Sequence, residues 1–413
     1  MTTRTAVPRY RSYDGPALFR QGFRPFFLAA GMWSALAVPL WLLVFHGSAV
    51  IPTAFDAAAW HAHEMIFGFA AAVVAGFLLT AIPNWTCRLP LQGLPLIVLF
   101  TLWLVGRGAV AASAVIGALP AAALDAAFLV ALLAVALREI IAGRNWRNLP
   151  MLLALVLLIA ANGLTHLQAA DLALTGPLGE RLGIATLVLL IGLVGGRIIP
   201  SFTRNWLAKR GAGAMPAAFG GFDKLCLLAT LAALACWVFS VEPAIAGGAL
   251  LAAGLLNLAR LARWQGHQTF SEPLVWSLHL GFLWVPLGLL LLGLASLLPA
   301  LVPATAGLHA LTAGAVGAMT LAVMTRATLG HAGRDLRADR PTAIIYLAVA
   351  LAAATRVAAS LLSAAYLELL WTSALLWTLA FALFVLRYGS IHLSAPSKGG
   401  PTGQRTSRSP GRR

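Results

Sequence analysis

Nine histidines are spread along the chain, and six of them fall within long apolar runs or just beyond the end of one. An imidazole is costly to bury in a bilayer, so it usually faces the interior of a helix bundle and serves a site there. Haem iron takes one or two axial imidazoles from facing helices, and copper takes imidazoles as well. The candidate haem or metal ligands are His61, His63, His166, His279, His309 and His331.

The spacing within W-H-A-H-E-M (60–65) predicts which of these side chains share a site. Residues i and i+3 lie on one helix face, whereas residues i and i+2 point apart. His61 and Glu64 are therefore expected to approach one site, while His63 faces another. Glu64 is the candidate catalytic residue, as a proton carrier or a third metal ligand.

Twelve apolar runs are long enough to hold these side chains inside a bilayer, since a helix needs about 20 apolar residues to cross a core of ~30 Å. The chain is 60% hydrophobic and only 10% charged, which is too little polar surface for a soluble protein of this length. The sequence therefore predicts an all-α, polytopic membrane protein. The expected helices lie near residues 26–46, 61–82, 93–112, 119–140, 149–169, 182–199, 222–240, 243–261, 273–297, 303–325, 342–364 and 368–387.

The positive charges predict the orientation of these helices. With the N-terminus in the cytoplasm, all of the 29 Lys and Arg residues except Arg107, Arg181 and Arg356 fall on the cytoplasmic side, as the positive-inside rule requires. The net charge of +16 is thus a topology signal and not a nucleic-acid-binding face. We expect an N-in/C-in protein with a cytoplasmic segment (1–25), a single membrane domain (26–390) and a disordered basic cytoplasmic tail (391–413).

This topology sets the depth of each histidine, at about 1.5 Å per residue along a helix. Four histidines from three helices share one band toward the outer side, which favours a common metal or proton-relay site over separate interhelical hydrogen bonds. Two others lie toward the inner side. The outer four are His61, His63, His166 and His309, and the inner two are His279 and His331.

Arginines and glycines near the histidines leave two interpretations open. Four arginines toward the inner face could pair with haem propionates, or could act as topology determinants that contact lipid phosphates. Four glycines on the helices that carry His63 and His309 could give clearance to a flat macrocycle, or could let helices pack closely. The arginines are Arg24, Arg197, Arg204 and Arg326, and the glycines are Gly68, Gly76, Gly314 and Gly317.

Other catalytic motifs are absent from the sequence, which contains no Walker A run, no H-E-x-x-H and no G-x-S-x-G. None of the three cysteines has the spacing of a metal ligand. Carboxylates within the expected helices are few, with Asp125 the clearest, which argues against proton-coupled transport.

Six segments place the histidines among aromatic, glycine and arginine residues: L-F-R-Q-G-F-R-P-F-F (18–27), W-H-A-H-E-M-I-F-G-F (60–69), A-I-P-N-W-T (81–86), G-G-R-I-I-P-S-F-T-R-N (195–205), W-S-L-H-L-G-F-L-W (276–284) and the long run from His309 to Arg334. In these segments the chain resembles the NnrS family of bacterial membrane proteins. The resemblance implies a twelve-helix protein of the bacterial inner membrane, associated with haem and copper, that acts in the response to nitric oxide and nitrosative stress. The family's histidine motifs fall on His61, His63, His279, His309 and His331.

The leading hypothesis is a membrane protein with haem b, copper being left open, that binds or reduces nitric oxide or nitrosyl species. It would take electrons from an unknown donor, as a nitric oxide reductase-like oxidoreductase, and would contact membrane lipid but no nucleic acid. The alternative is a transporter or exporter of a metal or nitrosyl-iron species that uses the same histidines transiently. A third hypothesis is a sensor or membrane scaffold without turnover.

Overall fold

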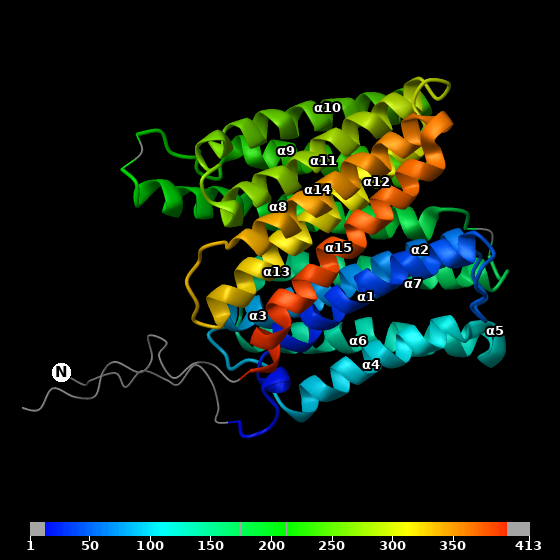
Figure 1. The fold of residues 1–413 in the computed structure, drawn as a ribbon, viewed down its shortest axis with the longest axis horizontal. Helices are drawn as coiled ribbons and strands as arrows, with labels where there is room; N and C mark the ends of the chain where they lie inside the picture. The colour runs from blue at the N-terminus through cyan, green and yellow to red at the C-terminus, as the bar shows by residue number, and fades with distance from the viewer. Residues whose placement is uncertain (1–12, 174, 212, 395–413) are drawn as a thin grey trace, which may run out of the picture.

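The computed structural model describes residues 13–173, 175–211 and 213–394, and all regular structure in these ranges is helical (Figure 1). Twelve spans within them are long and apolar enough to cross a membrane, which confirms the predicted number. The single-helix spans are α1 (Phe23–Phe45), α4 (Leu94–Ala111), α6 (Ala118–Ala142), α7 (Leu149–Ala169), α8 (Leu178–Ala208), α9 (Gly221–Val238), α10 (Pro243–Ala262), α11 (Pro273–Leu297), α14 (Arg340–Leu361) and α15 (Tyr366–Leu393). Short turns η1 (Ala17–Arg20), α5 (Ser113–Ile116), η3 (Trp146–Asn148), η4 (Gly266–Gln268) and η6 (Ser363–Ala365) flank them.

Two further spans are composite and carry the central histidines. The first joins α2 (Ala57–His63), η2 (Glu64–Ala70) and α3 (Ala71–Thr86), and the second joins α12 (Ala304–His309), η5 (Ala310–Gly317) and α13 (Ala318–His331). Both η2 and η5 are π-helical stretches that begin directly after a histidine. A π-helical turn changes the direction of the side chains that follow it and is frequent at functional sites. The two composite spans are also similar in sequence, because a glycine follows each of these histidines at the fifth position.

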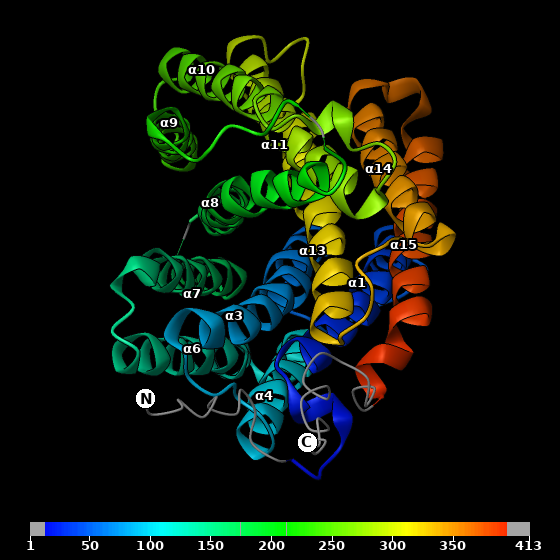
Figure 2. The ribbon, with the colours of Figure 1, turned by 90° about the vertical axis from the view of Figure 1, so that its left-hand side faces the viewer.

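These composite spans are the two most buried of the twelve, with 72% and 67% of their apolar windows inside the protein. Figure 2 shows α3 and α13 between a group formed by α4, α6 and α7 and a group formed by α8, α9, α10 and α11. The helix α1 packs against both α3 and α15, and α15 packs against α14. The bundle therefore carries its histidine-bearing helices at its centre, where intramembrane polar groups can be compensated.

The ends of the bundle differ in detail from the expected domain boundaries. The helix α15 runs to Leu393, so residues 391–393, which the sequence placed in the tail, are helical. Arg24 near the start of α1 donates hydrogen bonds to three backbone carbonyls at the end of α15, at 2.7 to 3.0 Å. These bonds satisfy carbonyls that a helix end leaves without partners, and they hold the two ends of the described chain on one side of the bundle. The rest of the expected tail (395–413) and residues 1–12 of the expected N-terminal segment lie outside the described residues.

A buried ion pair between α9 and α10 leads to a prediction about stability. Arg260 is fully buried and donates from Nε to Asp223 Oδ1 at 2.9 Å and from Nη1 to the Gly192 carbonyl at 3.1 Å. Replacing Arg260 by methionine leaves the buried Asp223 carboxylate without its counter-charge, so we expect a loss of about 3–5 kcal/mol in the free energy of unfolding. Thermal unfolding in detergent measures this loss.

The matched control is the same substitution at Arg387, whose pair with Asp339 spans 2.6 Å but leaves both side chains more than a third exposed. An exposed pair contributes about 1 kcal/mol or less, so Arg387→Met is expected to change the unfolding temperature little. Equal effects of the two substitutions would contradict the interpretation that burial makes the loss of the Arg260 counter-charge more costly than the loss of an exposed partner.

Candidate functional site

Five ionisable side chains are buried together near the end of the bundle that the positive-inside rule places outside. Each of these side chains is at most 4% exposed. They come from α2, η2, α4, α6 and α7, so five segments of chain must pack before the group exists. We call this group the outer cluster; it consists of His63, Glu64, Arg107, Asp125 and His166.

Arg107 lies at the centre of the outer cluster and bridges its two carboxylates. Its Nη1 donates to Glu64 Oε1 at 2.7 Å, and its Nη2 donates to Asp125 Oδ1. The second oxygen of Glu64 accepts a hydrogen bond from Trp33 Nε1 at 2.8 Å. Both oxygens of Glu64 are therefore engaged, and its partners come from α1 and α4.

The expected pairing of His61 with Glu64 is wrong. Glu64 lies with His63, whose Nδ1 is 3.4 Å from Glu64 Oε1, although the two residues are adjacent in the chain. The physical reason is the guanidinium of Arg107 on α4, because a buried carboxylate turns toward a counter-charge within its reach. The expectation that His61 and His63 face different sites agrees with the structure.

Asp125 joins the two histidines of the outer cluster. Its Oδ2 lies 3.1 Å from His63 Nε2 and 3.1 Å from His166 Nε2, and it accepts a hydrogen bond from Asn162 Nδ2 at 2.6 Å. One ligand atom from each of His63, Asp125 and His166 lies within 4.8 Å of the others, close enough to hold a metal ion. Two imidazoles and a carboxylate form a donor set suited to a borderline transition metal.

The charges of the outer cluster also favour a bound cation. Two carboxylates and one guanidinium sum to one negative charge when both imidazoles are neutral, and an unbalanced charge is costly at this depth. A neutral imidazole donates from only one nitrogen, yet both nitrogens of His63 face carboxylate oxygens. A proton or a metal ion near His63 would balance the charge.

A second site lies on the other face of the segment that carries His61 and His63, away from the outer cluster. His61, His309 and Arg356 come from α2, α12 and α14 and line one cavity, whose empty space is about 670 Å³ when its open mouth is included. Trp41 and Trp377 form part of its wall. We call this space the histidine cavity. It brings together the two central composite spans at the ends of their first helical segments.

The two imidazoles of the histidine cavity have ligand atoms to offer. His309 Nδ1 lies 2.7 Å from the Thr305 carbonyl oxygen, so this nitrogen donates and leaves Nε2 as the acceptor. Such a backbone hydrogen bond is the usual support of a metal-ligating histidine. His61 stacks on Trp41 with ring centroids 4.3 Å apart, and its buried Nδ1 has no hydrogen-bond partner among the described residues. A buried nitrogen without a partner is what a bound group would satisfy.

The two inner histidines do not join either outer site. His279 Nε2 lies 2.8 Å from Thr203 Oγ1 on α8, which is an ordinary interhelical hydrogen bond. The ring of His331 packs against Phe23, with centroids 5.7 Å apart. The six candidate ligands therefore separate into two pairs and two single residues. The four outer histidines form two sites, which agrees with the helical spacing of His61 and His63 but not with the single shared site that their common depth favoured.

The predicted arginines mostly serve helix ends and local contacts. Arg24 caps α15 as described above, Arg204 donates to the Pro216 carbonyl at 2.8 Å, and Arg326 lies over the Phe202 ring at 3.9 Å. Arg197 is exposed. The arginines that face the two sites are Arg107 and Arg356, and the sequence did carry a signal for them, because both are exceptions to the positive-inside pattern within apolar runs.

Protein side chains occupy the space beside the four candidate glycines on the composite spans. A methyl group added at Gly68 would lie 2.6 Å from Glu64 Oε2, and one added at Gly314 would lie 2.5 Å from the Trp284 ring. Similarly, Phe27 covers Gly76 and Trp377 covers Gly317. These contacts favour close packing over clearance for a macrocycle.

Twelve apolar spans around a buried histidine and carboxylate centre define a multi-pass α-helical membrane protein with a candidate metal site. The family described as NnrS protein matches residues 17–395, nearly the whole chain. The chain therefore belongs to the NnrS family, as its motifs suggested. No curated protein matches it.

Proposed function

We propose that this protein binds haem b in the histidine cavity and uses it to bind or reduce nitric oxide in the bacterial inner membrane, as a defence against nitrosative stress. The observation that carries the proposal is the meeting of His61 and His309, from the two central spans, in one cavity with Arg356. Two imidazoles from facing helices are the usual axial ligands of a membrane haem.

The side chains of the histidine cavity fit a haem group. The hydrogen bond from His309 to the Thr305 carbonyl leaves Nε2 available as a ligand, and the buried Nδ1 of His61 lacks a partner in the described chain. Arg356 forms no ion pair with a carboxylate of the described residues, so its charge is available to a propionate. Haem iron would supply a redox-active centre with affinity for nitric oxide.

Other residues of the chain have roles around the proposed haem. Trp41 and Trp377 line it with apolar surface, which limits the entry of water. His63, Asp125 and His166 would hold copper if the protein contains it, since two imidazoles and a carboxylate suit a borderline transition metal. The role of Glu64 as a proton carrier stays a prediction. Both of its oxygens accept hydrogen bonds, from Arg107 and Trp33, so Glu64 would have to release one of these partners to carry a proton.

The alternative of a transporter for a metal or nitrosyl-iron species has less support. A charged cargo needs a path lined by polar groups through the membrane. The cavity next to the histidine cavity on its inner side is lined almost entirely by apolar side chains. Such a lining favours an uncharged substrate.

The direct test is the absorption spectrum and metal content of the wild-type protein, purified in detergent after expression with sufficient haem. We expect a Soret band, stoichiometric haem b in the pyridine haemochrome assay, and a spectral change when nitric oxide is added. Absence of haem from well-folded protein would overturn the proposal. Decay of nitric oxide with an artificial electron donor then separates a reductase from a protein that only binds the gas.

A further inference from the structure

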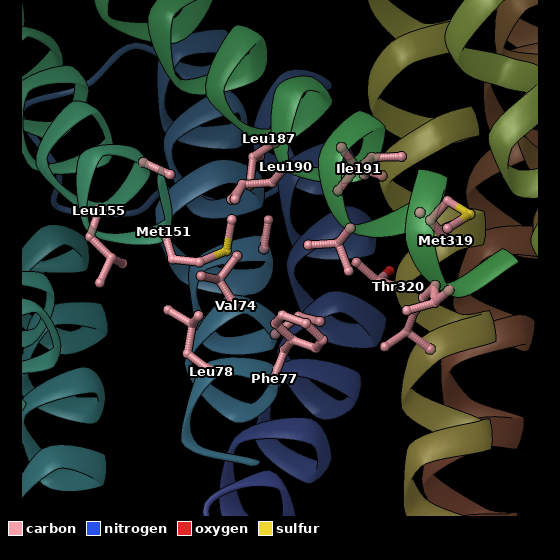
Figure 3. A pocket seen from close by; sticks show the side chains of 18 residues that line it. Val74, Phe77, Leu78, Met151, Leu155, Leu187, Leu190, Ile191, Met319 and Thr320 are labelled. Carbon is pink, nitrogen blue, oxygen red and sulfur yellow. The ribbon is translucent and has the colours of Figure 1, made fainter. Parts of the chain in front are cut away.

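An apolar cavity lies on the inner side of the histidine cavity. Its walls come mainly from α3, α7, α8 and α13, and its empty space is about 740 Å³ when the part open to the surroundings is included. Figure 3 shows Val74 and Phe77 of α3 facing Leu187 and Leu190 of α8 across this space. We call it the apolar cavity. No site described above uses it.

The lining of the apolar cavity offers a guest almost no hydrogen bonds. Of its 18 lining residues, Thr320 alone has a hydroxyl, amide or charged side chain. The Thr320 hydroxyl already donates to the Gly317 carbonyl at 2.9 Å. Water in such a space would lose hydrogen bonds without replacement, and an ion would lose far more. The chemistry of the lining therefore favours uncharged, apolar guests.

The apolar cavity meets the histidine cavity at two side chains. Leu187 on α8 and Val316 on η5 line both spaces. Each of these side chains is itself buried. The helix α8 packs against η2 and η5, so it contacts the composite spans where the two cavities join. Leu187 and Val316 therefore lie where the two cavities adjoin, and we call this pair of side chains the neck.

We propose that the apolar cavity is the passage by which an uncharged diatomic gas travels from the membrane interior to the histidine cavity. The identity of the gas as nitric oxide rests on the proposed function. A small apolar gas dissolves better in hydrocarbon than in water, so a passage within the bundle supplies it at a higher concentration than an aqueous route would. The neck is lined by two branched aliphatic side chains, which pass a diatomic molecule and hold back water.

The first test narrows the neck. In Val316→Phe and Leu187→Phe the larger ring fills the space that the two cavities share. We expect carbon monoxide to rebind after photolysis about tenfold more slowly than in the wild type, which corresponds to about 1.4 kcal/mol of added barrier. The matched control is Val130→Phe, because Val130 on α6 is half exposed on the outer surface and lines neither cavity. Haem content is measured for every variant, so that rates are compared only among loaded proteins.

The second test needs no haem and no catalytic activity. Crystals of the wild-type protein pressurised with xenon should show the gas in the apolar cavity and at the neck beside Val316. Val316→Phe should lose the xenon at the neck and keep it between Met151 and Met319. If the purified protein lacks haem but takes up xenon in this way, the passage stands and the proposed function fails.

Two results would overturn the passage. One is a lipid acyl chain filling the apolar cavity, with no xenon entering. The other is a rebinding rate that Val316→Phe and Leu187→Phe leave equal to that of Val130→Phe in loaded protein.

Discussion

His309→Ala is expected to yield a folded protein that no longer binds the haem proposed for the histidine cavity. His309 is supported for ligation by its hydrogen bond of 2.7 Å to the Thr305 carbonyl, and it faces the histidine cavity together with His61. Loss of the residues that merely orient a ligand already costs about 10–100-fold in metal affinity. Loss of the ligand itself is therefore expected to cost at least about 100-fold. The pyridine haemochrome assay on equal amounts of purified protein measures the effect.

A control and a rescue make this prediction specific. His46→Ala removes a histidine that stacks on Trp371, with centroids 5.3 Å apart, and that lines no cavity described above. It should retain full haem content. His309→Gly should regain haem when imidazole is supplied during expression, because the added ring can occupy the space of the lost side chain. Normal haem in His309→Ala would exclude this residue as a ligand.

Arg107→Met is expected to reduce the stability of the protein more than Arg260→Met. The guanidinium bridges Glu64 and Asp125, and all three side chains are almost completely buried. Its removal leaves two carboxylates in a low-dielectric interior. Breaking one buried pair costs about 3–5 kcal/mol, so the loss of both contacts is expected to reach or exceed the upper end of that range. Thermal unfolding and the yield of membrane-inserted protein measure it.

Neutral substitutions distinguish charge from packing in this prediction. In the triple variant Arg107→Met, Glu64→Gln and Asp125→Asn no charge is left unpaired, so most of the lost stability should return. Arg138→Met is the control, since Arg138 pairs with Glu139 while 63% of its side chain is exposed. Persistent instability of the triple variant would show that Arg107 acts through its shape and not through its charge.

The sequence alone determined the class of protein, the number of membrane spans and the family, and it singled out the histidines as candidate site residues. Helix crossing depends on the local content of apolar residues, so twelve runs of about 20 residues are sufficient to predict twelve spans. The histidines stand out because an ionisable side chain is costly at membrane depth and usually serves a site in the bundle interior. The motifs around His61 and His309 also indicated the family, which the match over residues 17–395 confirms.

Only the tertiary structure decided which of these residues act together. Spacing along one helix predicted a shared face for His61 and Glu64, but the partner of a buried charge is set by whatever the neighbouring helices present. Arg107 on α4 draws Glu64 to His63 and Asp125, and α12 brings His309 to His61. The ion pairs of Arg107 and the shared cavity of His61 and His309 join residues from separate helices, so no local pattern in the sequence contains them. Helix packing therefore decided that the four histidines at one depth form an ion-paired cluster and a separate cavity.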